Sequence, residues 1–99
     1  MPTYLMFATL SPQGLQTLRA TPERLFEVNR ESEALGVRVL QQWALLGPYD
    51  ILSVVDAPDR EAVMQLSAKM AARGSAQVVT LPVLEIEDFL DTMAQTSDH

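Results

Sequence analysis

The apolar residues near the start of the chain form a short run that favours a β-strand. Residues 3–10 (TYLMFATL) are rich in strand-forming side chains and end at the turn-prone segment 11–14 (SPQG). This pattern predicts a first strand followed by a short helical turn around Leu15 and Leu18.

The next apolar residues recur every three or four positions, which predicts a helix between Thr21 and Gly36. Thr21 can cap its first turn, and Pro22 suits the first helical position. Gly36 can end the helix because glycine tolerates the left-handed backbone found after helices. The residues expected to face inward are Leu25, Val28, Ser32 and Leu35.

Two further apolar runs predict a β-hairpin. Residues 37–46 (VRVLQQWALL) and 51–56 (ILSVVD) favour the second and third strands, and residues 47–50 (GPYD) favour the turn between them. A second helix is expected to start at residues 57–59 (APD) and to end at Gly74. Its inward positions are expected to be Ala62, Val63, Leu66 and Met70.

A last strand and a last helix are predicted near the end of the chain. Residues 77–85 (QVVTLPVLE) favour a fourth strand, and Pro82 places it at a sheet edge or bulge because proline cannot donate a ladder hydrogen bond. A short helix over residues 86–94 follows, and the tail 95–99 is expected to be flexible. The apolar residues of this helix, three or four positions apart, are Ile86, Phe89, Leu90 and Met93.

The predicted order is strand, helix, strand, strand, helix, strand, with an added C-terminal helix. This is the split βαβ arrangement of an α+β, ferredoxin-like fold. We expect a single domain over residues 1–94, built on a four-stranded antiparallel sheet. Right-handed crossovers place both helices on one face of the sheet and the first and third strands at its centre.

The two central strands are apolar on both faces, which two helices on one face cannot explain. Side chains alternate between the faces of a strand, so Met6 points one way while Leu5 and Phe7 point the other. We therefore expect a homo-oligomer, a dimer or larger, in which a second copy covers the free face. The alternative is that the terminal helix, residues 86–94, folds back over that face within one chain.

Composition and charge argue against several classes of function. Thirteen acidic residues against seven basic ones give a net charge of −6, which offers no attraction to nucleic acid or to anionic membranes. No apolar run is long enough to cross a bilayer, and the first residues do not resemble a signal peptide. The absence of cysteine fits the reducing cytoplasm, where we expect the protein to be located.

The side chains also predict no metal and no cofactor. The only histidine is His99 at the C-terminus, so the central imidazole of zinc, haem and Ser-His sites is missing. The glycines fall at turns and helix ends, and they do not form a phosphate-binding loop. Glu23, Glu27 and Glu31 are four positions apart on one helix, which predicts a solvated face.

The hairpin region carries a motif. Gly47, Tyr49 and Asp50 form a Gly-x-Tyr-Asp pattern, residues 56–59 (DAPD) form an acidic helix start, and the chain opens with MPTYL. In these features and in its order of elements, the sequence resembles the GYD-domain family over nearly its whole length. It departs from the family at Leu45, where many members carry a hydroxyl residue.

The resemblance implies a ferredoxin-like protomer of the dimeric α/β-barrel group. Members of that group include cofactor-free monooxygenases, isomerases and proteins that only bind a ligand. The resemblance therefore leaves both an enzyme and a binding protein open for this chain.

The motif residues allow two interpretations. In the structural one, the glycine and proline shape the turn, Asp50 accepts backbone N–H bonds and the Tyr49 ring anchors the hairpin. In the functional one, Tyr49 and Asp50 line a ligand pocket with Trp43 and Arg38, either between sheet and helices or between protomers.

We expect a homo-oligomeric binding or regulatory domain for a small molecule of unknown identity. The alternative is a cofactor-free isomerase or monooxygenase that acts on a small, partly apolar organic substrate. In that case Tyr49 would serve as proton donor and Asp50 as base or orienting group.

Overall fold

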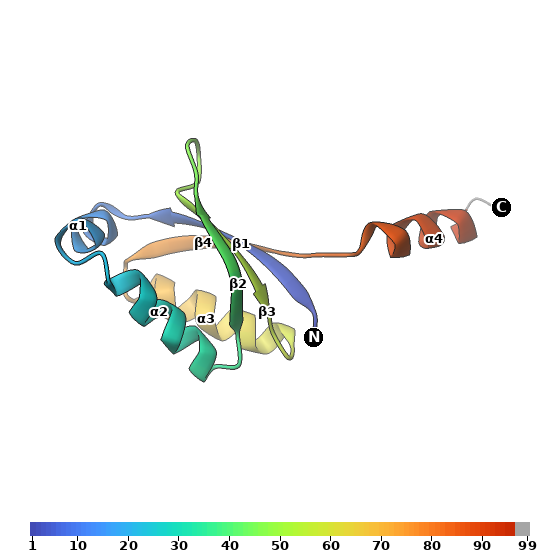
Figure 1. Ribbon diagram of the computed structural model, residues 1–99, viewed down its shortest axis with the longest axis horizontal. Coiled ribbons are helices and arrows are strands. Elements are labelled where there is room, and N and C mark those ends of the chain that lie inside the picture. The colour runs from blue at the N-terminus through green and yellow to red at the C-terminus, as the bar shows by residue number, and fades with distance from the viewer. Residues whose placement is uncertain (97–99) are drawn as a thin grey trace.

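The computed structural model describes residues 1–96, which form four strands and four helices (Figure 1). The strands are β1 (Thr3–Leu10), β2 (Arg38–Ala44), β3 (Ile51–Asp56) and β4 (Ala76–Pro82). The helices are α1 (Pro12–Ala20), α2 (Arg24–Ala34), α3 (Arg60–Ala72) and α4 (Ile86–Thr96).

The four strands form one antiparallel sheet in the order β2-β3-β1-β4. The predicted α+β, ferredoxin-like arrangement is confirmed, with β1 and β3 at the centre. Helices α2 and α3 lie on the same side of the sheet (Figure 1). Pro82 is the last residue of β4, and β4 is an edge strand, which is where a residue without a backbone N–H is tolerated.

The hydrophobic core lies between the sheet and these helices. Tyr4 and Met6 of β1 and Val55 of β3 are buried there, because alternate residues of a strand share one face. From α3, the buried residues are Ala62, Val63 and Leu66, at the three- and four-residue spacing of one helix face. Helix α3 starts directly after the predicted segment 57–59, and Asp59 caps it, since its carboxylate accepts the N–H of Ala62 at 2.9 Å.

The start of the main helix differs from the prediction. Thr21 does not cap α2; it ends α1, where its N–H donates to the carbonyl oxygen of Thr17 at 2.8 Å. The expected helical turn near Leu15 is a full nine-residue helix, α1, because the hydroxyl of Ser11 caps it by accepting the N–H of Gly14. Helix α2 therefore begins only at Arg24.

Two strands also differ in detail from their predicted ranges. The fourth strand ends at Pro82, although the N–H of Val83 still donates to the carbonyl oxygen of Thr3 at 3.0 Å. In β2, the pairing with β3 shifts by one residue between Val39 and Gln41. This bulge changes which residues of β2 face the helices.

The terminal helix α4 extends away from the sheet (Figure 1). It therefore does not cover the free face of its own sheet, which was the alternative to an oligomer. Residues 95 and 96 of the predicted tail belong to α4, and residues 97–99 lie outside the described part of the chain.

A close approach between α1 and the start of β4 requires glycine at position 14. A Cβ at Gly14 would lie well inside contact distance of the Ser75 carbonyl oxygen. The same carbonyl accepts the N–H of Ser11 at 3.0 Å. The hydroxyl of Ser11 donates to the carbonyl oxygen of Gly74 at 2.6 Å, so this corner is fixed by several bonds.

We predict that Gly14→Ala destabilises the protein although alanine is the better helix former. Overpacking costs about 1–3 kcal/mol, against a gain of roughly 1 kcal/mol or less in helix propensity, and backbone atoms cannot easily move aside. Chemical denaturation measures the free energy of unfolding of this variant, with the exposed Gln16→Ala as control. Equal or higher stability of Gly14→Ala would contradict the close approach.

Candidate functional site

The face of the sheet opposite α2 and α3, here called the open face, is largely apolar. Its members follow from the strand register and from the alternation of side chains. They are Leu5, Phe7, Trp43, Leu52, Val54, Val79 and Leu81. On the two edge strands, Trp43, Val79 and Leu81 are 48%, 44% and 47% exposed. A sheet face of this kind is typical of a surface that another molecule covers.

Asp50 holds the hairpin against the end of β1. Its carboxylate oxygen Oδ2 accepts the N–H of Leu10 at 2.8 Å, and its own N–H donates to the carbonyl oxygen of Ala8 at 2.8 Å. Its carbonyl oxygen also accepts the N–H of Leu45, which closes the hairpin. These bonds occupy Asp50 in the way that the structural interpretation of the motif predicts.

The other three predicted site residues lie along the open face. The Tyr49 ring packs against the Phe7 ring, with 5.0 Å between the ring centroids. Trp43 pairs with Leu52, the neighbour of Phe7, whereas Arg38 lies at the far end of β2. Trp43, Tyr49, Asp50 and Arg38 are all absent from the lining of the cavity between sheet and helices. A pocket between protomers, formed by these residues, stays a prediction.

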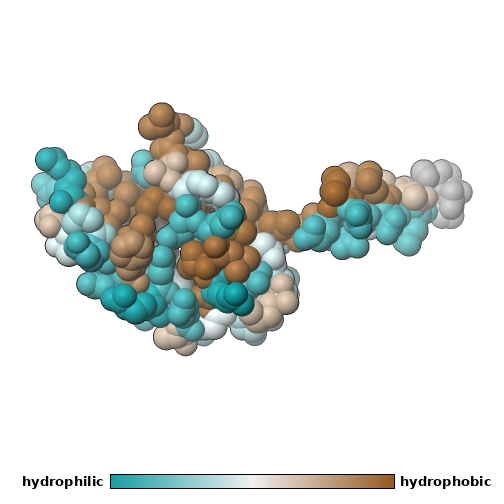
Figure 2. All heavy atoms as spheres, in the orientation of Figure 1, coloured by the Kyte–Doolittle hydropathy of each residue, from teal (hydrophilic) through white to brown (hydrophobic). Residues whose placement is uncertain are grey.

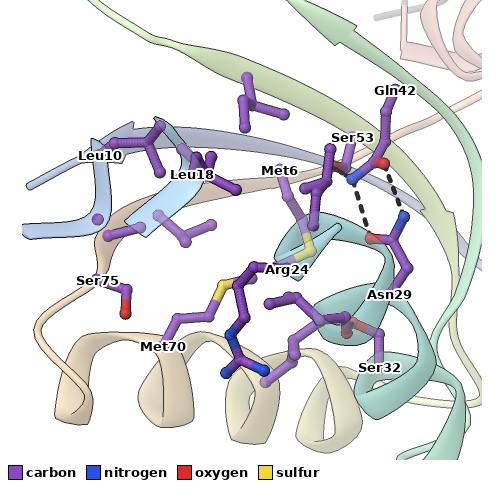
Figure 3. A pocket seen from close by; sticks show the side chains of 18 of the residues that line it. Met6, Leu10, Leu18, Arg24, Asn29, Ser32, Gln42, Ser53, Met70 and Ser75 are labelled. Carbon is purple, nitrogen blue, oxygen red and sulfur yellow. Dashed lines mark hydrogen bonds between the residues drawn. The ribbon is translucent and has the colours of Figure 1, made fainter. Parts of the chain in front are cut away.

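A cavity of about 110 Å³ lies between the sheet and the helices (Figure 3). Met6 reaches it from β1 and Met70 reaches it from α3, and other apolar side chains complete most of its wall. The helices leave this space because α2 packs along β2 while α3 packs along β4. The cavity is a partly enclosed and mainly apolar space of the kind that binds small molecules.

Three polar side chains form one wall of this cavity. The amides of Asn29 and Gln42 are joined by two hydrogen bonds, of 2.8 and 3.2 Å, and Gln42 also donates to the Ser53 hydroxyl at 2.9 Å. Figure 3 shows the two bonds between Asn29 and Gln42, which link α2 to β2. The three side chains are only partly buried, and these hydrogen bonds hold them in place. From this position they can form hydrogen bonds to a ligand.

Ion pairs join α2 to the end of α3 where the cavity meets solvent. Glu31 lies 3.5 Å from Arg24 and 2.6 Å from Arg73, and all three side chains are about a third exposed. The pKa of Glu31 lies below its ordinary value of 4.5, mainly because Arg73 donates a hydrogen bond to its carboxylate. Burial opposes this shift, whereas the positive charges of Arg73, Arg24 and Lys69 add to it. Glu31 is therefore a bridge between helices as well as part of a solvated face.

No residue of this cavity was predicted from the sequence to belong to a site. Ser53 offered one signal, because it is a polar residue at a helix-facing position of an apolar strand. Gln42 gave none, since its direction depends on the bulge in β2. The contact between Glu31 and Arg73 joins residues of different helices, and no local spacing predicts it.

Comparisons with known proteins agree with this architecture. The profile of the GYD domain matches residues 4–93. A protein of Thermus thermophilus, named glutamine synthetase and cystathionine beta-lyase binding protein, is 43% identical over 91 residues, which make up 91% of this chain and 96% of that protein.

A solved structure shares the fold. The crystal structure of TTHA0845, also from Thermus thermophilus, matches 86% of this chain and 95% of its own, with a TM-score of 0.54 and 17% identity. Within residues 1–96, no helix is long and apolar enough to cross a membrane. The same residues contain no cluster of three acidic, histidine or cysteine side chains that would hold a metal ion.

We predict that Glu31→Gln lowers the stability of the protein most strongly near neutral pH. A carboxylate whose folded pKa lies below its unfolded value stabilises the fold above about pH 4.5, and this contribution is lost as the pH falls through the lower, folded pKa. The difference in unfolding free energy between wild type and variant should therefore be largest at pH 7 and should disappear as the pH is lowered to strongly acidic values. The matched control is Glu33→Gln on the same helix. A stability gap for Glu31→Gln that is independent of pH would refute the bridge.

Proposed function

Because this chain belongs to the GYD-domain family, we propose that it is a cytoplasmic, homo-oligomeric binding domain that attaches to a partner enzyme and binds a small ligand. The observation that carries this proposal is the 43% identity, over nearly the whole of both chains, to a protein named for binding two enzymes. The open face and α4 supply two separate apolar surfaces for the contacts that the proposal requires.

We assign the open face to a second copy of the chain. Its centre, around Leu5 and Phe7, is apolar, and the charged residues Arg38 and Asp56 lie at one end of the sheet. A two-fold interface uses the same patch on both copies. Each apolar side chain in that patch is therefore buried in both copies, which doubles its contribution to the interface. The resemblance to the GYD-domain family implies a member of the dimeric α/β-barrel group, which is in keeping with this assignment.

We predict that Val79→Glu separates the oligomer into single chains. Val79 is 44% exposed on the open face, so a carboxylate there is tolerated in the protomer but not in a dry interface. Leu15→Glu is the matched control, because Leu15 is 47% exposed on α1, away from this face. Light scattering should report at least twice the 11.0 kDa chain mass for wild type and control. A wild-type protein that is monomeric at micromolar concentration and melts cooperatively would overturn the assignment.

We assign the apolar side of α4 to the partner enzyme. Figure 2 shows this helix divided into a hydrophobic side and a hydrophilic side. On the hydrophobic side, Ile86, Phe89 and Leu90 are 65%, 42% and 57% exposed. An amphipathic helix that extends from a domain can lay its apolar side into a groove of another protein. Its acidic residues, including Glu87 and Asp88, would then remain in water.

We predict that the double variant Phe89→Ser/Leu90→Ser loses binding to the partner enzyme. Interferometry with immobilised glutamine synthetase and cystathionine beta-lyase tests this, with the Thermus relative as positive control. Wild type should bind at least one enzyme, and the double variant should bind about tenfold more weakly or worse, because buried apolar anchors dominate such contacts. Asp91→Asn, on the hydrophilic side, should bind like wild type.

The partner proposal fails if neither enzyme retains this chain while the relative is retained. It also fails if both variants bind as wild type does. In either case the oligomer measurement is unaffected, because it uses a different surface.

The catalytic alternative receives no specific support from the geometry. The carboxylate of Asp50 accepts a backbone N–H, and Tyr49 packs on Phe7 at the edge of the open face. We therefore retain the binding function as the proposal.

A further inference from the structure

We propose that the cavity between the sheet, α2 and α3 is a binding site for a small apolar carboxylate, such as a branched-chain or aromatic monocarboxylate. This inference rests on the proposed binding function and names the class of its small ligand. The apolar part of the ligand would lie between Met6 and Met70, and its carboxylate would face Arg24 and Arg73.

The size of the cavity limits the ligand to a few carbon atoms. Its volume of about 110 Å³ is somewhat smaller than that of an engineered protein cavity of about 150 Å³ that binds benzene. Met6 and Met70 point into it from opposite sides, and thioether side chains adapt to ligands of different shape. An apolar group of about four to six carbons is therefore the appropriate size.

The polar wall keeps hydrogen-bonding capacity that its own contacts do not use. Gln42 uses both hydrogens of its amide nitrogen, on Asn29 and on Ser53. Asn29 uses one amide hydrogen, and Ser53 accepts a bond with its hydroxyl oxygen. One amide hydrogen and one hydroxyl hydrogen remain, together with one lone pair on each of the three oxygens. This wall can therefore donate hydrogen bonds to a carboxylate, but the choice of an anion must come from the arginines.

The charges where the cavity meets solvent favour an anion. Arg24 and Arg73 both line the cavity, and each uses only its Nη1 nitrogen in the ion pairs with Glu27 and Glu31. The other guanidinium nitrogens can still donate. Among the described residues that line the cavity, Arg24 and Arg73 are the only charged ones, although the whole chain carries a net charge of −6. Arginine binds carboxylates with paired, charge-assisted hydrogen bonds.

Titrations followed by two-dimensional NMR test the assignment directly. The carboxylate probes are 4-methylpentanoate and benzoate. Two compounds with the same carbon skeleton as 4-methylpentanoate serve as controls: 4-methylpentanamide is neutral, and 4-methylpentylamine is a cation. We expect saturable shifts at cavity residues with the carboxylates. The amide should bind at least about tenfold more weakly than the carboxylate, because a charge-assisted hydrogen bond is lost. The amine should not bind, because its positive charge would face the arginines.

Three variants locate the binding site. Arg24→Met keeps the aliphatic stem but removes the guanidinium, and should weaken carboxylate binding by about tenfold or more. Arg30→Met, an exposed position on the same helix, should leave binding unchanged. Ala8→Leu fills the cavity from β1 and should abolish binding. If Ala8→Leu does not fold, the arginine pair still decides the question.

The inference is overturned if no carboxylate gives saturable shifts at millimolar concentration, or if the amine binds as well as the acid. Equal weakening by Arg24→Met and Arg30→Met would overturn it as well. None of these outcomes changes the oligomer mass or the capture of a partner enzyme, so a failure here is distinct from a failure of the proposed function.

Discussion

The structure depends on one constraint: the two central strands are apolar on both faces, and the chain has helices for only one of them. Met6 of β1 and Val55 of β3 are buried in the core together with residues of α3, while Leu5 and Phe7 of β1 face the opposite side. The hydrophobic effect acts equally on both faces. The helices therefore cover one face of the sheet and leave the apolar side chains of the other face exposed, and the proposed second copy would cover them.

Two short polar side chains fix the C-terminal end of β1. This strand contributes residues to both faces of the sheet, so its position affects both. Ser11 caps α1 and bonds to the carbonyl oxygen of Gly74, which ties β1 to the start of β4. Asp50 accepts the N–H of Leu10, which ties the same end to the hairpin. The aspartate of the Gly-x-Tyr-Asp motif thus has a structural task that explains its position, independent of any chemistry.

Local patterns in the sequence predicted the elements better than they predicted the site. The strands, the start of α3 after residues 57–59 and the edge position of Pro82 follow from residue spacing and backbone chemistry, and the structure has them. The cavity could not be predicted in the same way. Gln42 reaches it because of the bulge after Val39, and the bridge from Glu31 joins two helices far apart in sequence. Such contacts depend on how elements pack, which no short-range pattern encodes.

The cavity and the open face are two sides of the same strands. Met6 and Ser53 face the cavity, whereas their neighbours Phe7 and Leu52 face away from it and pair with each other. Packed side chains do not compress freely, so a ligand that displaces β1 or β3 also changes the surface offered to a second copy. Linkage then requires the second copy to change the affinity for that ligand by the same factor. Helix α4 follows β4 at the edge of the sheet and extends away from both faces, so the proposed coupling would not involve it.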